Sequence, residues 1–413
     1  MNKLISVFRE NSKKENMFVL PIIILFYILC FFIPSFSALP IFNYITIVIV
    51  ILLCLLILAW RLVFHKIVLN YFFFGIVIFN IAIFVSNLFN KDANHIITYV
   101  TLSGMSFCLF QFFLEKKYRN IVRFLVFLSF ATFAIYFAFY YRSLLFDFSV
   151  ERIGDKFDNL NTVGYYFLFS FVTSLAFINR NNKLSLLLLV PAGVFLFFLY
   201  RTGSRSALIL AFLSIIIYVF YFFKGLKIII PIVVVLCIFG LGIVIAVIAE
   251  KAFDISIFSR LGEFFDALNG EGTDYSSANR IELAIQSFLL FLRKPIFGWG
   301  NNVFSIYSSE RLFAHNNITE LLCDYGLFGF LPFECILIFS YYSIKKSKAK
   351  NQLVDYSILL LICVFGIQFF YVNSQLKFDW IAIAFFASEA TLCSKEIVKT
   401  SKPRIFEYIE MTI

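Results

Sequence analysis

The sequence predicts an all-α protein that crosses a membrane many times, and two observations support this class. First, 61% of the 413 residues are hydrophobic and only 15% are charged, whereas soluble proteins carry about 25% charged residues. Second, apolar runs of about 18 residues or more recur along the chain, and each can cross roughly 30 Å of hydrocarbon as a helix. These runs lack the alternation of apolar and polar residues that lipid-facing β-strands show.

The apolar runs predict about twelve membrane-spanning helices, packed as a single integral membrane domain over residues 1–413. A basic lead-in precedes the first run, but no small-residue cleavage site follows it. We therefore expect an anchor helix and not a cleaved signal peptide. The expected spans start near Met17, Ile41, Ile67, Ile96, Ile121, Thr162, Leu184, Ser206, Ile228, Asn317, Val354 and Asp379.

Lysines and arginines are distributed unevenly between the loops on the two sides of the predicted bundle. Most of the 35 basic residues fall in the short loops and tails on the side that holds both termini. Because cytoplasmic loops carry an excess of basic residues, both termini are expected to be cytoplasmic. The net charge of +10 then reflects this topology and contact with anionic lipids of the bilayer. No nucleic-acid partner is expected.

The smaller set of basic residues, on the opposite or outer side, is rich in arginine. A guanidinium group is a planar fork that can bind two oxygens of a phosphate or carboxylate at once. The outer side is therefore expected to bind an anion. The alternative is that these arginines pair with outer acidic residues, among them Glu151, Asp155 and Glu282.

The longest segment between two predicted spans covers residues 250–316, on the same outer side. Its second half has apolar residues at the spacing i, i+3, i+4, i+7, i+8 and i+11, which predicts one apolar stripe along a helix. Pro295, Gly298 and Gly300 end this pattern. We expect an interfacial helix that lies on or dips into the outer membrane surface. The stripe consists of Ile281, Ala284, Ile285, Phe288, Leu289 and Leu292.

The predicted sixth, eighth and tenth spans run inward from the outer side, so their N-termini, which favour anions, face outward. The eighth span begins with "YRTGSRSALIL", in which Ser204 is the expected N-cap and Arg205 falls in the first helical turn. Arg201 lies four residues earlier, and we expect the two guanidinium groups to cradle an anion. The alternative is that these arginines extend to lipid head groups.

The tenth span begins with "AHNNITELL", which places a histidine next to its start. Asn317 is the expected N-cap, and Glu320 then occupies the third helical position, as in a capping box. The positive end of the helix disfavours protonation of His315, and a neutral imidazole suits a general base. The alternative is a histidine with no chemical role. The sixth span, "DNLNTVGYYF", has Asn161 as its expected cap.

Several of these stretches, taken in order, resemble the O-antigen ligase and Wzy-type polymerase superfamily. They are "DKFDNLNTVGYY", "RTGSRSALIL", "NRIELAIQSFLLFLRKPIFGWGNNVF" and "FAHNNITELLCDYGLFGFL". The family pattern has a serine–arginine pair at a span start, then R…P-x-x-G-x-G in a long outer loop. A histidine–asparagine pair follows, and then E-x-x-x-x-x-G-x-x-G, which Glu320, Gly326 and Gly329 fill. The resemblance covers about residues 155–335.

The resemblance implies a membrane-embedded, GT-C-like glycosyltransferase in a bacterial cytoplasmic (inner) membrane. Its donor would be an oligosaccharide on undecaprenyl diphosphate, used at the outer leaflet. Arg205 and Arg280 would bind the diphosphate, and His315 would act on the acceptor hydroxyl. A flippase and a chain-length regulator are the protein partners it suggests. The further candidates for binding the diphosphate or the glycan are Arg201, Ser204, Asn161, Asn316, Glu320 and Trp299.

Neither a metal nor another cofactor is expected for this chemistry. The predicted outer segments contain no D-x-D or E-x-D sequence that could hold a divalent cation. Arginines would then stabilise the negative charge that develops on the leaving phosphate. Direct displacement at the anomeric carbon would invert its configuration.

Three functions remain open at this point. Abundant Ile, Phe, Lys and Asn suggest a low-GC genome, which favours a polymerase of repeat units for capsule, exopolysaccharide or O-antigen. The same machinery suits a ligase that moves the glycan to lipid A core, a wall polymer or a protein. A flippase or transporter of lipid-linked glycans predicts internal repeats and charges within the spans. The sequence shows no clear repeat, and its spans are nearly free of charge.

Overall fold

The computed structural model is built from helices, and the residues that it describes contain no strand. This confirms the predicted all-α class. The described residues are 2–36, 40–88, 94–147, 150, 152–157, 159–178, 182–223, 227–238, 240, 244, 275–301, 303–308, 313–346, 352–372 and 376–400.

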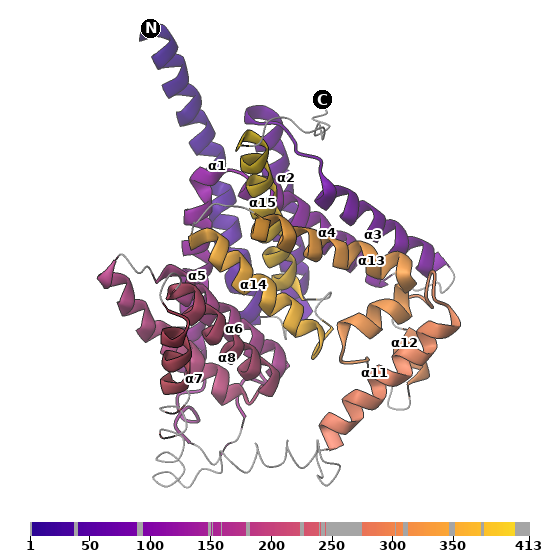
Figure 1. Ribbon diagram of the computed structural model, residues 1–413. Coiled ribbons are helices and arrows are strands. Elements are labelled where there is room, and N and C mark those ends of the chain that lie inside the picture. The colour runs from indigo at the N-terminus through magenta and orange to yellow at the C-terminus, as the bar shows by residue number, and fades with distance from the viewer. Residues whose placement is uncertain are drawn as a thin grey trace.

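The labelled helices follow one another along the chain as drawn in Figure 1. They are α1 (Asn2–Phe36), α2 (Pro40–Phe64), α3 (Tyr71–Leu88), α4 (Asn94–Phe113), α5 (Lys116–Tyr140), α6 (Leu160–Phe177), η1 (Lys183–Leu188), α7 (Leu189–Thr202), α8 (Arg205–Phe222), α11 (Tyr275–Arg293), α12 (Val303–Tyr307), α13 (Asn317–Lys346), α14 (Gln352–Gln368) and α15 (Lys377–Thr400).

Nine helices in the described part of the chain are long and apolar enough to cross a membrane, as expected for a multi-pass membrane protein. They are α1 to α6, η1 with α7, α8, and α13. At the predicted ninth span, Ile229–Ile238 forms a shorter apolar helix. Most of residues 239–274 lie outside the described residues, so the first half of the predicted outer loop is not described. α14 and α15 occupy the places of the last two predicted spans.

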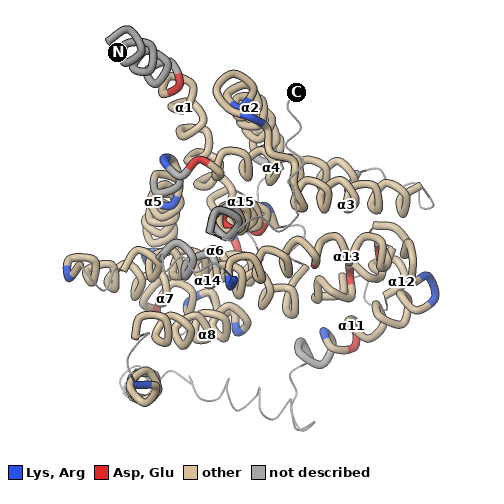
Figure 2. Tube along the Cα trace, turned by 45° about the horizontal axis from the view of Figure 1, so that its top comes forward, with Lys and Arg blue, Asp and Glu red and all other residues tan. Residues whose placement is uncertain are grey.

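The centre of the bundle is formed where α3, α13 and α15 meet. Phe79 of α3, Phe333 of α13 and Trp380 of α15 contact one another, with ring centroids 5.7 to 5.9 Å apart. All three side chains are buried. Figure 2 shows the charged residues mainly near the ends of the helices, so the interior is held together by apolar and aromatic packing.

Helix α13 is broken within its length at Gly326, whose backbone is not helical (φ 61°, ψ −165°). A break leaves backbone N–H and C=O groups without partners inside the helix, which is costly in a membrane. Residues 295–300, which follow α11, supply the missing partners. Four backbone hydrogen bonds join the two segments: Trp299 N–H to Cys323 O (2.9 Å), Gly300 N–H to Asp324 O (2.8 Å), Leu327 N–H to Pro295 O (2.8 Å) and Phe328 N–H to Ile296 O (3.0 Å).

Two glycines allow this close backbone contact, which we call the 295–300 clamp. Gly298 and Gly326 both have positive φ values, 70° and 61°, a region that other residues rarely adopt. A Cβ atom on Gly298 would collide with backbone atoms of Asp324, and one on Gly326 would collide with backbone atoms of Ile296. The glycines of the two sequence motifs therefore serve one contact, in which each motif packs against the other.

We expect that Gly298→Ala and Gly326→Ala each lower the thermal unfolding midpoint of the detergent-purified protein. The new Cβ meets backbone and not a flexible side chain, and such overpacking costs about 1–3 kcal/mol. Gly104→Ala in α4 and Gly193→Ala in α7 are matched controls, because a Cβ at either position has no neighbour within 4 Å. Unchanged midpoints for both clamp variants would show that the contact does not stabilise the fold.

Candidate active site

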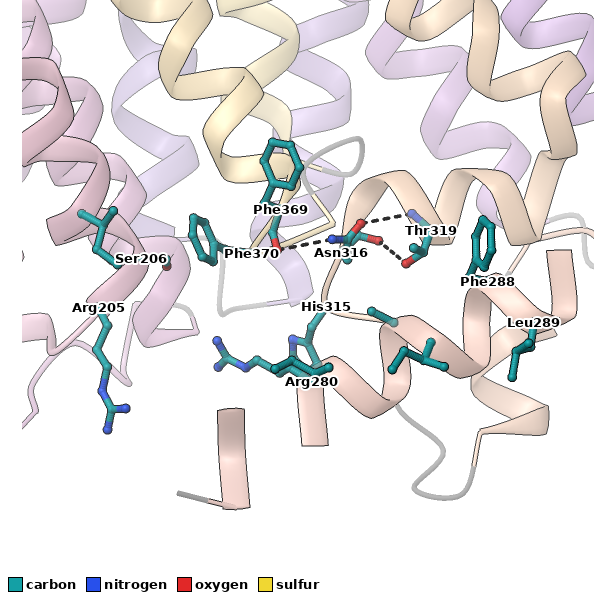
Figure 3. Close-up of a pocket in the computed structure, with 14 residues that line it drawn as sticks. Arg205, Ser206, Arg280, Phe288, Leu289, His315, Asn316, Thr319, Phe369 and Phe370 are labelled. Carbon is teal, nitrogen blue, oxygen red and sulfur yellow. Dashed lines mark hydrogen bonds between the residues drawn. The ribbon is translucent and has the colours of Figure 1, made fainter. Parts of the chain in front are cut away.

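A cavity of about 500 Å³ opens between α8 and α11. Its lining comes from α8, one face of α11, three residues at the start of α13 (His315, Asn316 and Thr319), and the two phenylalanines that follow α14 (Figure 3). In Figure 1 this is the end of the bundle opposite the start of α1 and the end of α15, and we call it the pocket end. Segments far apart in the sequence thus form one site.

Three of the predicted site residues lie together at the polar side of this cavity: Arg205 of α8, Arg280 of α11 and His315 before α13. In Figure 3 the side chains of Arg280 and His315 lie next to each other, and Arg205 extends from the start of α8 on the other side of the opening. Arg205 is exposed, while Arg280 and His315 are half-buried. The arrangement presents two guanidinium groups and one imidazole to the same space.

The predicted apolar stripe of α11 forms the other side of the cavity. Five of its six members, from Ile281 to Leu289, line the space, and Phe288 and Leu289 are 43% and 55% exposed. The opposite face of α11 packs against α13, where Leu283 and Ser287 are fully buried and Ser287 Oγ donates to Thr319 O (2.9 Å). The stripe is therefore left free to contact an apolar ligand or lipid, and the cavity has a charged end and an apolar flank.

The environment of His315 keeps its imidazole neutral. Burial lowers the pKa of His315, and the positive charge of Arg280 lowers it further, to about 4. The ring lies 4.2 Å from that of Phe313, centroid to centroid. Its Nδ1 atom is buried and has no hydrogen-bond partner among the described residues. The prediction of a neutral imidazole is thus supported, with burial as the main cause.

The start of α13 is capped one residue earlier than the sequence suggested. The helix begins at Asn317, and Asn316 is its N-cap, because Asn316 Oδ1 accepts a hydrogen bond from the N–H of Thr319 (3.1 Å). Asn317 is buried instead, and its Nδ2 donates to Gln368 Oε1 of α14 (3.2 Å). The assignment of Asn317 as the cap was wrong because either neighbouring asparagine satisfies the sequence pattern. Asn316 also lines the cavity.

Glu320 lies behind the cavity wall and does not line it. Its side chain is only 4% exposed, and Oε2 accepts a hydrogen bond of 2.6 Å from the backbone N–H of Ala314. It is the fourth residue of α13 and not the third, since the cap is Asn316. The predicted capping-box pair is therefore absent, and the carboxyl group binds the loop that carries His315.

Arg201 and Arg205 do not form the expected pair on one helix start. Arg201 lies in the last turn of α7, is 2% exposed, and donates from Nη2 to Leu144 O (2.7 Å) and Asp147 O (2.9 Å). The helix ends there because Gly203, with φ 65°, is the C-cap of α7. Arg201 therefore binds the segment after α5, whereas Arg205 lines the cavity. Ser204 is the N-cap of α8, as predicted, but its side chain makes no capping hydrogen bond.

Asn161 and Trp299 also lie outside the cavity lining. The N-cap of α6 is Asn159, whose side chain accepts a hydrogen bond from the N–H of Asn161 (2.9 Å). The assignment of Asn161 as the cap was wrong because "DNLN" offers two asparagines with the same chemistry. Trp299 Nε1 donates to Leu290 O (2.8 Å), and Lys294 Nζ lies 3.9 Å from its ring centroid. These contacts hold residues 294–299 against α11.

Two features of the site were not anticipated from the sequence. Phe369 and Phe370 line the cavity, but nothing distinguishes them among the 59 phenylalanines of the chain. The hydroxyl group of Tyr165, which does not line the cavity, lies 2.8 Å from that of the lining residue Ser206. This pair joins α6 to the start of α8, where Gly164 packs against the Ser204 side chain. A glycine after "NTV" was the available signal for this close packing.

The described residues contain no group of three or more His, Cys, Asp or Glu side chains that could hold a metal ion. The expectation of metal-independent chemistry stays a prediction.

We expect that Arg201→Gln lowers the thermal unfolding midpoint and that Arg205→Gln leaves it nearly unchanged. Arg201 is buried with two backbone acceptors, and hydrogen bonds from a charged group contribute about 1.5–3 kcal/mol. Arg205 is exposed at the cavity. Thermal unfolding of both variants in the same detergent provides the comparison. Equal losses of stability would contradict this division of roles.

Comparison with protein families supports the motif analysis. Residues 184–333 match a family model described as O-antigen ligase. The match includes Arg205, Arg280 and His315 and both partners of the 295–300 clamp. A search of curated proteins found no match. The matched segment confirms the resemblance seen in the sequence: residues 184–333 are similar to the O-antigen ligase family.

Proposed function

We propose that this protein is a membrane glycosyltransferase that polymerises oligosaccharide repeat units carried on undecaprenyl diphosphate. One observation carries the proposal: Arg205, Arg280 and His315, from three separate motifs, line a single cavity with an apolar flank. A lipid-linked diphosphate has the same two parts, an anionic head and a hydrocarbon chain. The pocket end would face outward from a bacterial cytoplasmic membrane, with both termini in the cytoplasm.

The donor would bind with its diphosphate between Arg205 and Arg280. Its polyprenyl chain would then lie against the apolar flank of α11, which continues from Arg280 to Leu289 over about 13 Å of helix. That flank is exposed in the structure, as shown by Ile285 at 55%. Phe369 and Phe370 would cover the chain from the side of α14.

His315 would act as the general base. It takes the proton of the acceptor hydroxyl while the acceptor oxygen attacks the anomeric carbon of the donor sugar. The bond from that carbon to the phosphate oxygen breaks, and lipid diphosphate leaves with the bonding electrons. Arg205 and Arg280 stabilise the charge on the leaving group, and attack from the opposite face inverts the anomeric centre.

The low pKa of His315 fits this sequence of events. In the ligand-free site burial opposes protonation of the imidazole, and the charge of Arg280 adds to this effect. A bound diphosphate offsets that charge, which raises the pKa of His315 toward the range where a base removes protons effectively. The base would therefore gain strength when the donor is in place.

A ligase is the second candidate, because the matching family model is described as O-antigen ligase. The two functions differ only in the acceptor, and mass spectrometry of the lipid-linked glycans in a deletion strain separates them. We expect single repeat units on lipid to accumulate, since a polymerase consumes them. Long chains on lipid would indicate a ligase. No accumulation of any lipid-linked glycan would contradict both.

Transfer by the purified protein should depend on His315 and on the geometry of the guanidinium groups. With lipid-linked repeat units and a chelator present, we expect His315→Ala to lose about 10²–10⁴-fold in rate. Arg205→Lys and Arg280→Lys should lose about 10²–10³-fold, because a point charge does not replace a fork. Near-normal rates in all three variants would refute the assigned roles, and loss of wild-type activity in chelator would refute metal independence.

The pH profile of kcat/KM, which reports groups in the free enzyme, should be flat between pH 8 and pH 5. His315 has a pKa of about 4, so its neutral form dominates over that whole range. A base with the ordinary histidine pKa of about 6.5 would instead lose about tenfold by pH 5.5. An acidic limb near pH 6.5 would show that the free enzyme does not hold His315 in this environment.

A further inference from the structure

The loop that carries His315 has a backbone conformation that needs support. His315 has φ 53°. Among the described residues, every other residue with positive φ is a glycine. For a residue with a Cβ this left-handed region is disfavoured, because the Cβ comes too close to a backbone carbonyl oxygen. Such a conformation persists only where neighbouring contacts determine it.

The contact on the N-terminal side of His315 is made by Glu320. Its Oε2 accepts the Ala314 N–H at 2.6 Å. In a capping box the acid binds the N–H of the N-cap residue itself. Here the carboxyl group binds the N–H of Ala314, two residues before the N-cap Asn316. Ala314 is fully buried beside Leu283 and Cys323. The hydrogen bond from Ala314 to Glu320 therefore links the two ends of the segment 314–320, which contains His315.

The contact on the C-terminal side is made by Asn316. Its Oδ1 accepts from Thr319 N–H (3.1 Å), and its Nδ2 donates to Phe369 O (3.4 Å). No hydrogen bond from Nδ1 orients the imidazole within the described structure, and the ring packs against Phe313 of the same loop. The direction of the ring is therefore set by the backbone on both sides.

We propose that Glu320 is a positioning residue: by binding the Ala314 N–H it holds His315 in the left-handed conformation that directs the imidazole into the cavity. This inference rests on the proposed function, in which His315 is the base. A carboxyl group suits the position because its Oε2 atom accepts the hydrogen bond of the buried Ala314 N–H. Glu320 therefore binds the backbone of the loop that carries His315, and not the imidazole ring itself.

Three variants separate positioning from general stability. Glu320→Leu keeps a similar volume but has no acceptor, whereas Glu320→Gln keeps an acceptor oxygen. Glu334→Gln is the matched control, because Glu334 is a second buried acid of α13 (8% exposed) outside the cavity lining. We expect kcat to fall about 10²-fold in Glu320→Leu, the loss that a misplacement of about 1 Å causes, with KM unchanged. Glu320→Gln and Glu334→Gln should stay within a few-fold of wild type.

The position of His315 can be followed without any assay of activity. The chain has only three histidines, so NMR signals of labelled rings can be assigned from His65→Gln and His95→Gln. In wild type the His315 ring, which shares the cavity with Arg280 and Arg205, should titrate near its pKa of about 4. Release of the loop in Glu320→Leu exposes the ring to water, so its titration should move toward pH 6.5. Glu320→Gln and Glu334→Gln should titrate as wild type.

The two readouts distinguish the two proposals. If Glu320→Leu shows wild-type titration and wild-type kcat while His315→Ala is inactive, the positioning role is wrong and the enzyme function stands. If wild type transfers no glycan but the titration shifts as expected, the function is wrong and the positioning role stands. Should Glu320→Leu fail to fold, Glu320→Ala removes the acceptor with less bulk. A wild-type His315 that titrates near pH 6.5 overturns the positioning role without any variant.

Discussion

Four backbone hydrogen bonds connect residues 295–300 to the two sides of the break in α13. Irregular backbone survives in a membrane protein only where other backbone or side chains satisfy it. The break at Gly326 and the 295–300 clamp therefore require each other. The clamp follows the end of α11 and therefore ties this helix to α13. α11 carries Arg280, and α13 begins two residues after His315. The spacing of these two side chains at the cavity depends on this contact, although none of its atoms lines the cavity.

A second close contact sets the position of Arg205. Gly164 of α6 packs against Ser204, and the Tyr165 hydroxyl meets that of Ser206, so the start of α8 is fixed against α6. The residues that follow α14 then connect the two sides of the cavity, which we call its halves: α6 with α8, and α11 with α13. Tyr371 accepts a hydrogen bond from Thr162 of α6 (3.3 Å), and the carbonyl of Phe369 accepts one from Asn316. The cavity lies between these halves, with an arginine from each.

The sequence predicts the parts of this site better than it predicts how they are joined. The apolar stripe of α11 and the placement of Arg205 and His315 beside helix starts follow from periodicity and capping, which are local. The caps themselves were displaced by one or two residues, because "DNLN" and "HNN" each contain two asparagines of equal chemistry. Arg201 was paired with Arg205 by spacing, yet Gly203 ends a helix between them. The roles of Glu320 and Trp299 depend on tertiary contacts and have no local signal.

In the proposed function, the electrostatics of the site also determine the order of events. Burial and, second to it, the charge of Arg280 disfavour protonation of His315 in the ligand-free cavity, so the imidazole is then a weak base. A neutral acceptor does nothing to change this, because it brings no charge to offset that of the guanidinium group. The diphosphate of the donor does offset it. The base therefore gains strength when the donor is bound, which disfavours deprotonation of the acceptor hydroxyl in a site that has nothing to transfer.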